Sequence, residues 1–219
     1  VQLFADQTLV AAELHCSPNP AAAAGEGAEP LELRGEALEL LELLLDGEPL
    51  PADAFRQEPG RLLLLVPPRR PFVLRSRVRI HPETNTSLEG LYVSGGMFTT
   101  QCEAEGFRRI TFHPDRPDLL SRFRVRIEAE EASCPVLLSN GNCLETGALP
   151  AAPNAAGAEP TPRHFAVWDD PFPKPSYLFA LVAGRLEEVR GSFTTASGRS
   201  VTLRIHVEPG DLPFTAHAM

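Results

Sequence analysis

The chain has 219 residues, of which 43% are hydrophobic, so it is long enough to build a substantial core. Its formal net charge of -9 would repel a nucleic-acid backbone, and its apolar runs, such as residues 62–66, are far too short to cross a bilayer. We therefore expect a soluble globular protein that binds neither nucleic acid nor a membrane.

Short segments rich in Val, Leu, Ile and Phe recur between turn residues, and we predict that each is a β-strand. They are residues 3–14, 62–66, 72–80, 123–127, 177–182 and 201–207. Residues 201–207 and 123–127 alternate apolar and polar side chains, which is typical of a strand with one buried face. The arginines at 75, 77 and 79 alternate in the same way and predict a solvent-facing side of a strand.

Turn residues separate these segments. The sequences DG at 46–47, NGN at 140–142 and SG at 197–198 lie between apolar runs and predict turns that close hairpins. Prolines at 67–68, 114, 117 and 171–175 are expected at strand ends or in loops, because proline cannot donate to a β-ladder. The pattern favours an all-β fold.

Residues 36–45 are strong helix formers and could form a helix of about ten residues. Pro30, Gly35 and the DG turn flank them, and a helix would expose leucines on most of its circumference, so we favour a strand. Two stretches rich in Ala, Pro and Gly, residues 18–29 and 148–162, predict surface loops. Neither marks a domain boundary, so residues 1–219 are predicted to form one domain.

The sequence shows no catalytic or metal-binding motif. Its six histidines lack the spacing of metal ligands, so no metal site is expected within this chain. Cys102 has no neighbour that would activate it and is expected to be a buried, inert thiol. Reduced thiols are favoured for all four cysteines, although a disulfide between Cys134 and Cys143 stays open.

One polar stretch, residues 99–108, is a candidate binding segment. If it is extended, Gln101, Glu103 and Glu105 project from the same side. The two carboxylates repel each other unless a cation lies beside them or a turn at Gly106 parts them. A bound ammonium group would satisfy them, and the alternative is a solvated edge or an ion pair with one of the two arginines that follow.

The sequence NTSLEGLY at 85–92, followed by TQCEAEGFR at 100–108, closely resembles the amino-terminal domain of the bacterial aminopeptidase N family of zinc metallopeptidases, the gluzincins. Further segments resemble that family in its own order: DRPD at 115–118, LLSNGN at 137–142, WDDPFPKP at 168–175, YLFALVAG at 177–184, FTT at 193–195 and SGR at 197–199. The resemblance runs essentially from end to end and is weakest at 36–45 and in the two Ala/Pro-rich stretches.

The resemblance implies a fold of curved antiparallel sheets packed as a β-sandwich or saddle, and it favours the strand at 36–45. In the family this domain leans on a thermolysin-like catalytic domain. It lends that domain a glutamate that binds the free α-amino group of the peptide and a glutamine that lines the first side-chain pocket. The matching positions here are the substrate-binding residues Glu103 and Gln101.

The family's catalytic motifs, GAMEN and HExxH, are absent from the 219 residues. The chain therefore contains no catalytic residues and no zinc ligands, and by itself it is expected to be inactive. The zinc of the full-length enzyme would be held by a catalytic domain missing from this chain.

The resemblance therefore implies the N-terminal domain of a zinc-dependent aminopeptidase that removes N-terminal amino acids from peptides, in the cytoplasm. Its expected partners are the N-terminus of a peptide substrate and the missing catalytic domain of the same polypeptide. The alternative is a stand-alone, non-enzymatic β-sandwich binding or scaffolding module. That alternative predicts no apolar patch of a size that would accommodate a partner domain.

Overall fold

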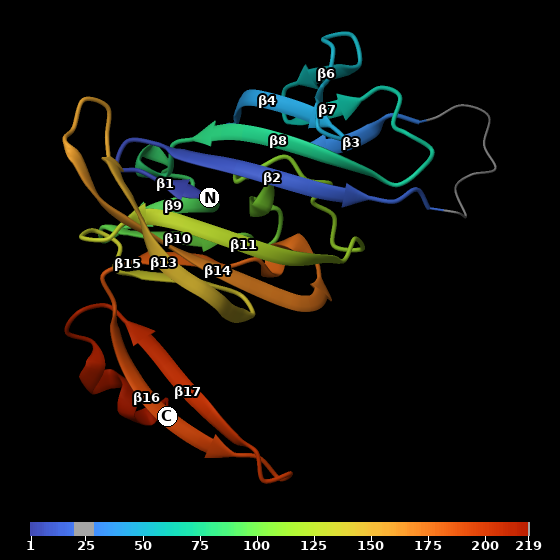
Figure 1. Cartoon of the computed structure of the whole chain (residues 1–219). Coiled ribbons are helices and arrows are strands. Elements are labelled where there is room, and N and C mark those ends of the chain that lie inside the picture. The colour runs from blue at the N-terminus through green and yellow to red at the C-terminus, as the bar shows by residue number, and fades with distance from the viewer. Residues whose placement is uncertain (20–28, 219) are drawn as a thin grey trace.

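The computed structural model describes residues 1–19 and 29–218, which form several packed β-sheets joined by loops and short 3-10 helices (Figure 1). The largest sheet has eight strands in the order β13-β14-β11-β1-β2-β8-β4-β5. Its strands are β1 (Gln2–Leu3), β2 (Thr8–Cys16), β4 (Glu39–Leu45), β5 (Glu48–Pro49), β8 (Phe72–Ile80), β11 (Ser121–Glu130), β13 (Asn142–Pro153) and β14 (Pro160–Lys174). The sheet is mixed, because β1 runs parallel to β11 while the other pairs are antiparallel.

Three smaller sheets complete the fold. The four-stranded sheet has the order β12 (Val136–Ser139), β15 (Leu181–Gly184), β10 (Met97–Gln101), β9 (Gly90–Ser94), and the three-stranded sheet has the order β3 (Leu31–Arg34), β7 (Arg61–Leu64), β6 (Phe55–Glu58). The hairpin of β16 (Glu187–Thr194) and β17 (Ser200–Val207) forms a sheet of its own. The 3-10 helices are η2 (Pro82–Thr84), η3 (Gly106–Arg109), η4 (Ser176–Leu178) and η5 (Leu212–His217).

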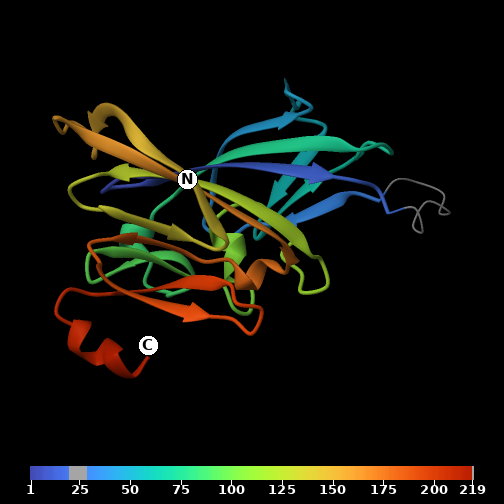
Figure 2. The same cartoon turned by 60° about the horizontal axis from the view of Figure 1, so that its bottom comes forward.

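In Figure 1 the eight-stranded sheet extends from β4 and β8 in the upper part of the molecule to β13 and β14 further down, and the β16–β17 hairpin lies lowest, beside the C-terminus. Figure 2 shows the hairpin and the C-terminus from another side. The predicted all-β class of packed sheets is confirmed. No helix in residues 1–19 or 29–218 combines the length and the apolar character needed to cross a membrane.

The strand predicted at 72–80 is confirmed and coincides with β8. Leu74 and Val78 are almost fully buried, whereas Arg75 lies on the exposed side. Neighbouring strands offset part of the positive charge on the exposed side, since Arg75 pairs with Glu13 on β2 at 2.6 Å. Cross-strand ion pairs therefore reduce the basic character of this face.

The strand favoured at 36–45 is also confirmed. It appears as β4, which pairs with β8 and contains a bulge between Leu40 and Glu42. The bulge and the pairing keep Leu43 in the core. Tertiary pairing thus overrides the helix propensity of this segment.

The loop predicted at 148–162 is wrong, because β13 continues to Pro153 and β14 begins at Pro160. These residues lie at the surface, as expected, but as a hairpin. The prolines are tolerated because β13 is the edge strand of its sheet and its register shifts between Leu149 and Ala152. Most of the other predicted loop, 18–29, lies outside the described residues.

Two further expectations need correction. In the segment 177–182, the first residues belong to η4, and β15 begins at Leu181. The Asn140 side chain explains this, because it bonds the backbone carbonyl of Leu178 and the backbone N–H of Ala180 in place of a neighbouring strand. The NGN turn joins β12 to β13, which lie in different sheets, so it does not close a hairpin.

The expected pattern of β17 holds, but its apolar side chains are half-buried rather than buried. The reason is that β16 and β17 form a two-stranded sheet. Phe193 on β16 is 58% exposed, and Phe214 in η5 is 79% exposed. The predicted SG turn closes this hairpin, with Gly198 at φ +80°.

Candidate functional site

The polar segment 99–108 leaves the four-stranded sheet at the end of β10. Gln101 is the last residue of β10 and pairs with Gly90 of β9. The chain then turns, with the backbone N–H of Gly106 donating to the carbonyl of Cys102 at 2.9 Å. Gln101, Glu103, Ala104 and Glu105 are exposed, while Cys102 is buried. The condition of an extended segment is therefore not met beyond Gln101, and we call residues 101–105 the site loop.

Two glycines let the site loop fold back closely on the backbone. A Cβ at Gly106 would lie 2.4 Å from the carbonyl oxygen of Gln101 and 2.9 Å from the nitrogen of Gly90. Gly90 has φ +72°, and a Cβ there would lie 2.6 Å from the Cβ of Arg109. Both contacts are too short for any larger residue, so the two glycines determine how the site loop sits against β9.

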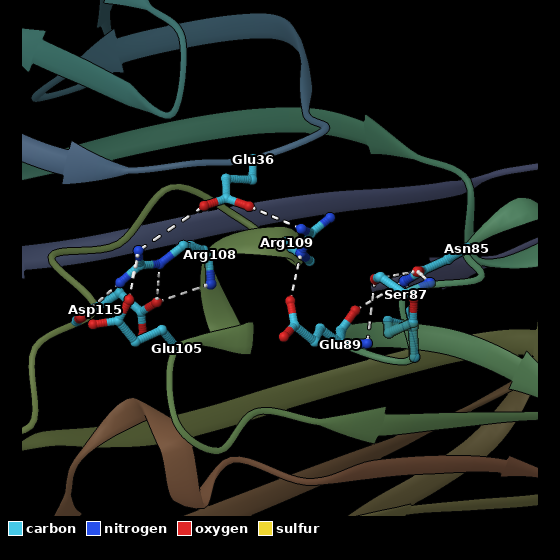
Figure 3. A network of polar contacts seen from close by, with 9 residues as sticks. Glu36, Asn85, Ser87, Glu89, Glu105, Arg108, Arg109 and Asp115 are labelled. Carbon is cyan, nitrogen blue, oxygen red and sulfur yellow. Dashed lines mark hydrogen bonds and ion pairs between the residues drawn. The ribbon is translucent and has the colours of Figure 1, made fainter.

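Arg108 in η3 joins the site loop to the interior of the molecule (Figure 3). Its Nε donates to the Oδ2 atom of Asp115 at 2.8 Å, and its Nη1 lies 2.9 Å from the Oε2 atom of Glu105. A third carboxylate, that of Glu36, lies 4.0 Å away. Burial lowers the pKa of Arg108, but the hydrogen bond with Asp115 and the surrounding carboxylates raise it above its usual value overall.

Arg109 has its own partners. Its Nη2 lies 3.0 Å from the Oε2 atom of Glu36, and its Nε lies 3.2 Å from the Oε2 atom of Glu89 (Figure 3). The loop that carries Glu89 is held by Asn85, whose side-chain amide donates to the carbonyls of Glu89 and Leu91. The arginines that follow the site loop thus bind carboxylates on three other segments of the chain.

Glu103 differs from all of these acidic residues. Within residues 1–19 and 29–218, its carboxylate makes no hydrogen bond and no ion pair. Its neighbour Glu105 pairs with Arg108, as the ion-pair alternative predicted. The site loop therefore presents one paired and one unpaired carboxylate, and the exposed side chain of Gln101 lies at its start.

The cysteine of the site loop is not suited to nucleophilic attack. Burial, and secondarily the charge of Asp115, raises the pKa of the Cys102 thiol to about 12, so it is not a thiolate at neutral pH. The expected burial of Cys102 is confirmed. All four cysteines are free, with Cys134 buried and Cys143 exposed. In the described part of the chain no group of three or more His, Cys, Asp or Glu could hold a metal ion.

His113 packs beneath the same network. Its ring lies edge-on to Phe107, with 5.0 Å between the ring centroids, and its Nδ1 accepts a hydrogen bond from the backbone N–H of Asp115 at 3.0 Å. The residue is 4% exposed. Burial lowers the pKa of His113 to about 4, although the charge of Asp115 opposes the shift.

This shift predicts a loss of stability in mild acid. The unfolded chain takes up a proton at His113 near pH 6.5, whereas the folded chain takes it up only near pH 4, so the free energy of unfolding falls as pH drops through this interval. The expected loss is about 3 kcal/mol. Urea denaturation at several pH values measures it.

The His113→Asn variant provides the comparison, since its side-chain oxygen can still accept the backbone N–H of Asp115. We expect this variant to lose the part of the pH dependence that belongs to His113. The exposed His15, changed to Asn, serves as the control and should keep the profile of the unaltered chain. If the free energy of unfolding depends on pH in the same way for the unaltered chain and for His113→Asn, His113 is not a buried neutral side chain.

The residues that support the site loop were missed by the sequence reasoning. Asp115 was noted as part of a family motif without a role, and Ser176, which donates to its Oδ1 atom at 2.7 Å, was given none. These two residues are 61 positions apart. Spacing along the chain could not have linked them, because the contact depends on how η4 packs on the sheet.

Comparison with known proteins identifies the fold. The family described as the Peptidase M1 N-terminal domain matches residues 53–178. Aminopeptidase N of Caulobacter vibrioides is 51% identical over 191 residues, which cover 87% of this chain and 21% of that protein. Aminopeptidase N of Escherichia coli is 46% identical over 195 residues, 89% of this chain and 21% of that protein. The chain spans about a fifth of the length of these relatives.

Solved structures agree. Aminopeptidase A of Legionella pneumophila, in complex with aspartic acid, aligns with a TM-score of 0.82 and 33% identity over 94% of this chain and 23% of that one. An M1 zinc metallopeptidase of Deinococcus radiodurans aligns with a TM-score of 0.68 at 16% identity, over 96% of this chain and 48% of that one, and shows the same fold. The chain therefore belongs to the M1 peptidase family, carries its N-terminal domain and is homologous to bacterial aminopeptidase N over most of its length.

Proposed function

We propose that this domain anchors the N-terminus of a peptide in the substrate cleft of an aminopeptidase that removes N-terminal amino acids. In this proposal Glu103 binds the α-amino group, and Gln101 lines the pocket of the first side chain. The observation that carries the proposal is the free carboxylate of Glu103, in a loop whose other carboxylate is already paired. A carboxylate without a partner, on a loop that packs closely against β9, is suited to an incoming ammonium group.

The relatives support this role. The Legionella aminopeptidase A structure holds aspartic acid, and the Deinococcus structure holds a Tyr-Ser-Ala substrate. Both ligands carry a free α-amino group. An ammonium group bound at a fixed point would also set the position of the first peptide bond, since it fixes the register of the substrate.

The zinc ion of the family does not fit the described residues of this chain, which contain no suitable group of ligands. We therefore propose that zinc and the residues that cleave the peptide bond belong to a catalytic domain outside these 219 residues. The cytoplasmic location and the single-domain organisation expected from the sequence are part of the same proposal.

The exposed side chains near the C-terminus favour this arrangement over a stand-alone module. Phe193 and Phe214 are more than half exposed, and the apolar side of β17 is only half-buried. Large apolar side chains that stay exposed on one hairpin and on the 3-10 helix after it are what we expect if another domain covers this part of the surface. A stand-alone scaffold predicts the opposite.

Matched substrates test the proposed recognition of the amino group. The assay uses a protein in which this chain continues into a zinc-bearing catalytic domain, here called the full-length protein. We expect it to hydrolyse alanine p-nitroanilide at least about a hundredfold faster than propionyl p-nitroanilide, which lacks the amino group and is otherwise the same. Equal rates would contradict the proposal, and the 219-residue chain alone should hydrolyse neither.

A further inference from the structure

Asp115 is a buried carboxylate whose oxygens are both engaged. It is 4% exposed, and its Oδ1 atom accepts the hydroxyl of Ser176 at 2.7 Å. Its Oδ2 atom accepts the Nε of Arg108 at 2.8 Å and the backbone N–H of the same residue at 3.3 Å. A buried charge persists in a fold when it is paired and hydrogen-bonded, as this one is.

The position of Arg108 follows from this anchor. Its side chain is 13% exposed, and the bond from Nε to Asp115 leaves Nη1 facing Glu105. Glu105 is itself 63% exposed, so the guanidinium, and not the carboxylate, is the fixed partner of that pair. Figure 3 shows Arg108 lying between Glu36, Glu105 and Asp115.

The free state of Glu103 therefore depends on where the guanidinium is held. The site loop carries two carboxylates within three residues, and an arginine that was free to move would be attracted to both. Arginine binds carboxylates in a bidentate manner and stays charged at every physiological pH, so it would compete with the ammonium group of a substrate.

We propose that Asp115 is a positioning residue that holds the guanidinium of Arg108 on Glu105 and so keeps Glu103 free for an amino group. This inference rests on the proposed function of Glu103. Ser176 contributes by fixing the second oxygen of the Asp115 carboxylate from a distant segment of the chain. Neither residue needs to touch the substrate.

Binding of two zinc-directed ligands to the full-length protein tests the proposal. Alanine hydroxamate carries an amino group, and propionohydroxamic acid is the same molecule without it. In the Asp115→Asn variant we expect the affinity for alanine hydroxamate, measured by calorimetry, to fall about tenfold, while the affinity for propionohydroxamic acid stays unchanged. Asparagine has nearly the same shape and tolerates the φ of 47° at this position.

The matched control is Asp118→Asn, three residues further on, where an exposed carboxylate pairs with Arg116 at 2.6 Å. It should change neither affinity. A second variant, Asp115→Asn combined with Arg108→Met, removes the competing guanidinium as well, and we expect it to regain the affinity for alanine hydroxamate to within about twofold. If Asp115 had a purely structural role, the double variant would not regain affinity for alanine hydroxamate alone.

The outcomes separate the two proposals. If Asp115→Asn lowers the affinity for both ligands equally, or for neither, the positioning role is overturned. If Glu103→Gln lowers the affinity for both ligands equally, or for neither, the proposed function of Glu103 is wrong. Should Asp115→Asn not fold, Ser176→Ala removes a single hydrogen bond to the same carboxylate, and the same selective loss, smaller in size, is then expected. Its absence in a folded Ser176→Ala protein also overturns the proposal.

Discussion

Replacing Glu103 by glutamine in the full-length protein is expected to lower kcat/KM for alanine p-nitroanilide by about a hundredfold or more. Glutamine keeps the size of the side chain and its acceptor oxygen but loses the charge that would pair with the α-ammonium group. Loss of one partner from a charge pair in a partly desolvated cleft costs about 2–5 kcal/mol. Because the same contact sets the register of the peptide bond, kcat is expected to fall as well as the affinity.

The comparison with propionyl p-nitroanilide makes this result specific. That substrate has no ammonium group that could pair with Glu103, so Glu103→Gln should leave its low rate of hydrolysis unchanged. Glu48→Gln is the matched control, because Glu48 is also an exposed carboxylate, on β5 of the eight-stranded sheet. It should leave both rates unchanged. A Glu103→Gln enzyme that keeps kcat/KM for the alanine substrate within about threefold would show that another group binds the amino terminus.

The strands of the sheets could be predicted because their determinants are local. In β8 the arginines at 75, 77 and 79 recur with a period of two, so the exposed side and the opposite, buried face both follow from the sequence. In β13 they do not, because its Ala- and Pro-rich sequence is tolerated only at the edge of a sheet. Whether a strand lies at an edge depends on the order of all the strands, which no local pattern records.

The candidate site was predicted less completely than the fold. The positions of Glu103 and Gln101 came from the resemblance to a family, and residue spacing could place their side chains only under the condition of an extended segment, which ends where the chain turns at Cys102. The turn there requires Gly106 to lie against the backbone of Gln101, an approach that only the folded chain reveals. The site loop therefore depends on contacts between segments, as does the link from Asp115 to Ser176.

The same dependence on distant contacts makes Phe112 important. Phe112 is 1% exposed and belongs to the hydrophobic core. A Cβ at Gly35, just after β3, would lie 2.3 Å from its ring, so the ring is packed directly against that backbone. Next to it, the backbone of His113 exchanges hydrogen bonds with the backbone of Arg34 at 2.8 and 3.1 Å. The segment therefore ties the three-stranded sheet to η3 and the site loop.

Phe112→Ala is expected to lower the free energy of unfolding by about 3–5 kcal/mol, because it removes a buried aromatic ring and leaves a cavity that the surrounding sheets cannot close. This is a large share of the about 5–15 kcal/mol that stabilises a typical domain. Phe112→Leu, which keeps most of the volume, should cost less than half as much. Urea denaturation of the 219-residue chain measures both variants.

The exposed Phe214 offers the matched control, since Phe214→Ala removes the same kind of ring from a position that is 79% exposed. We expect this variant to change the free energy of unfolding of the 219-residue chain by less than about 0.5 kcal/mol. In the full-length protein Phe214→Ala should cost more, because the proposed catalytic domain would cover that side chain. If Phe112→Ala costs less than about 1 kcal/mol, its ring does not hold the three-stranded sheet against the site loop, and the rigid support inferred for Glu103 would need another source.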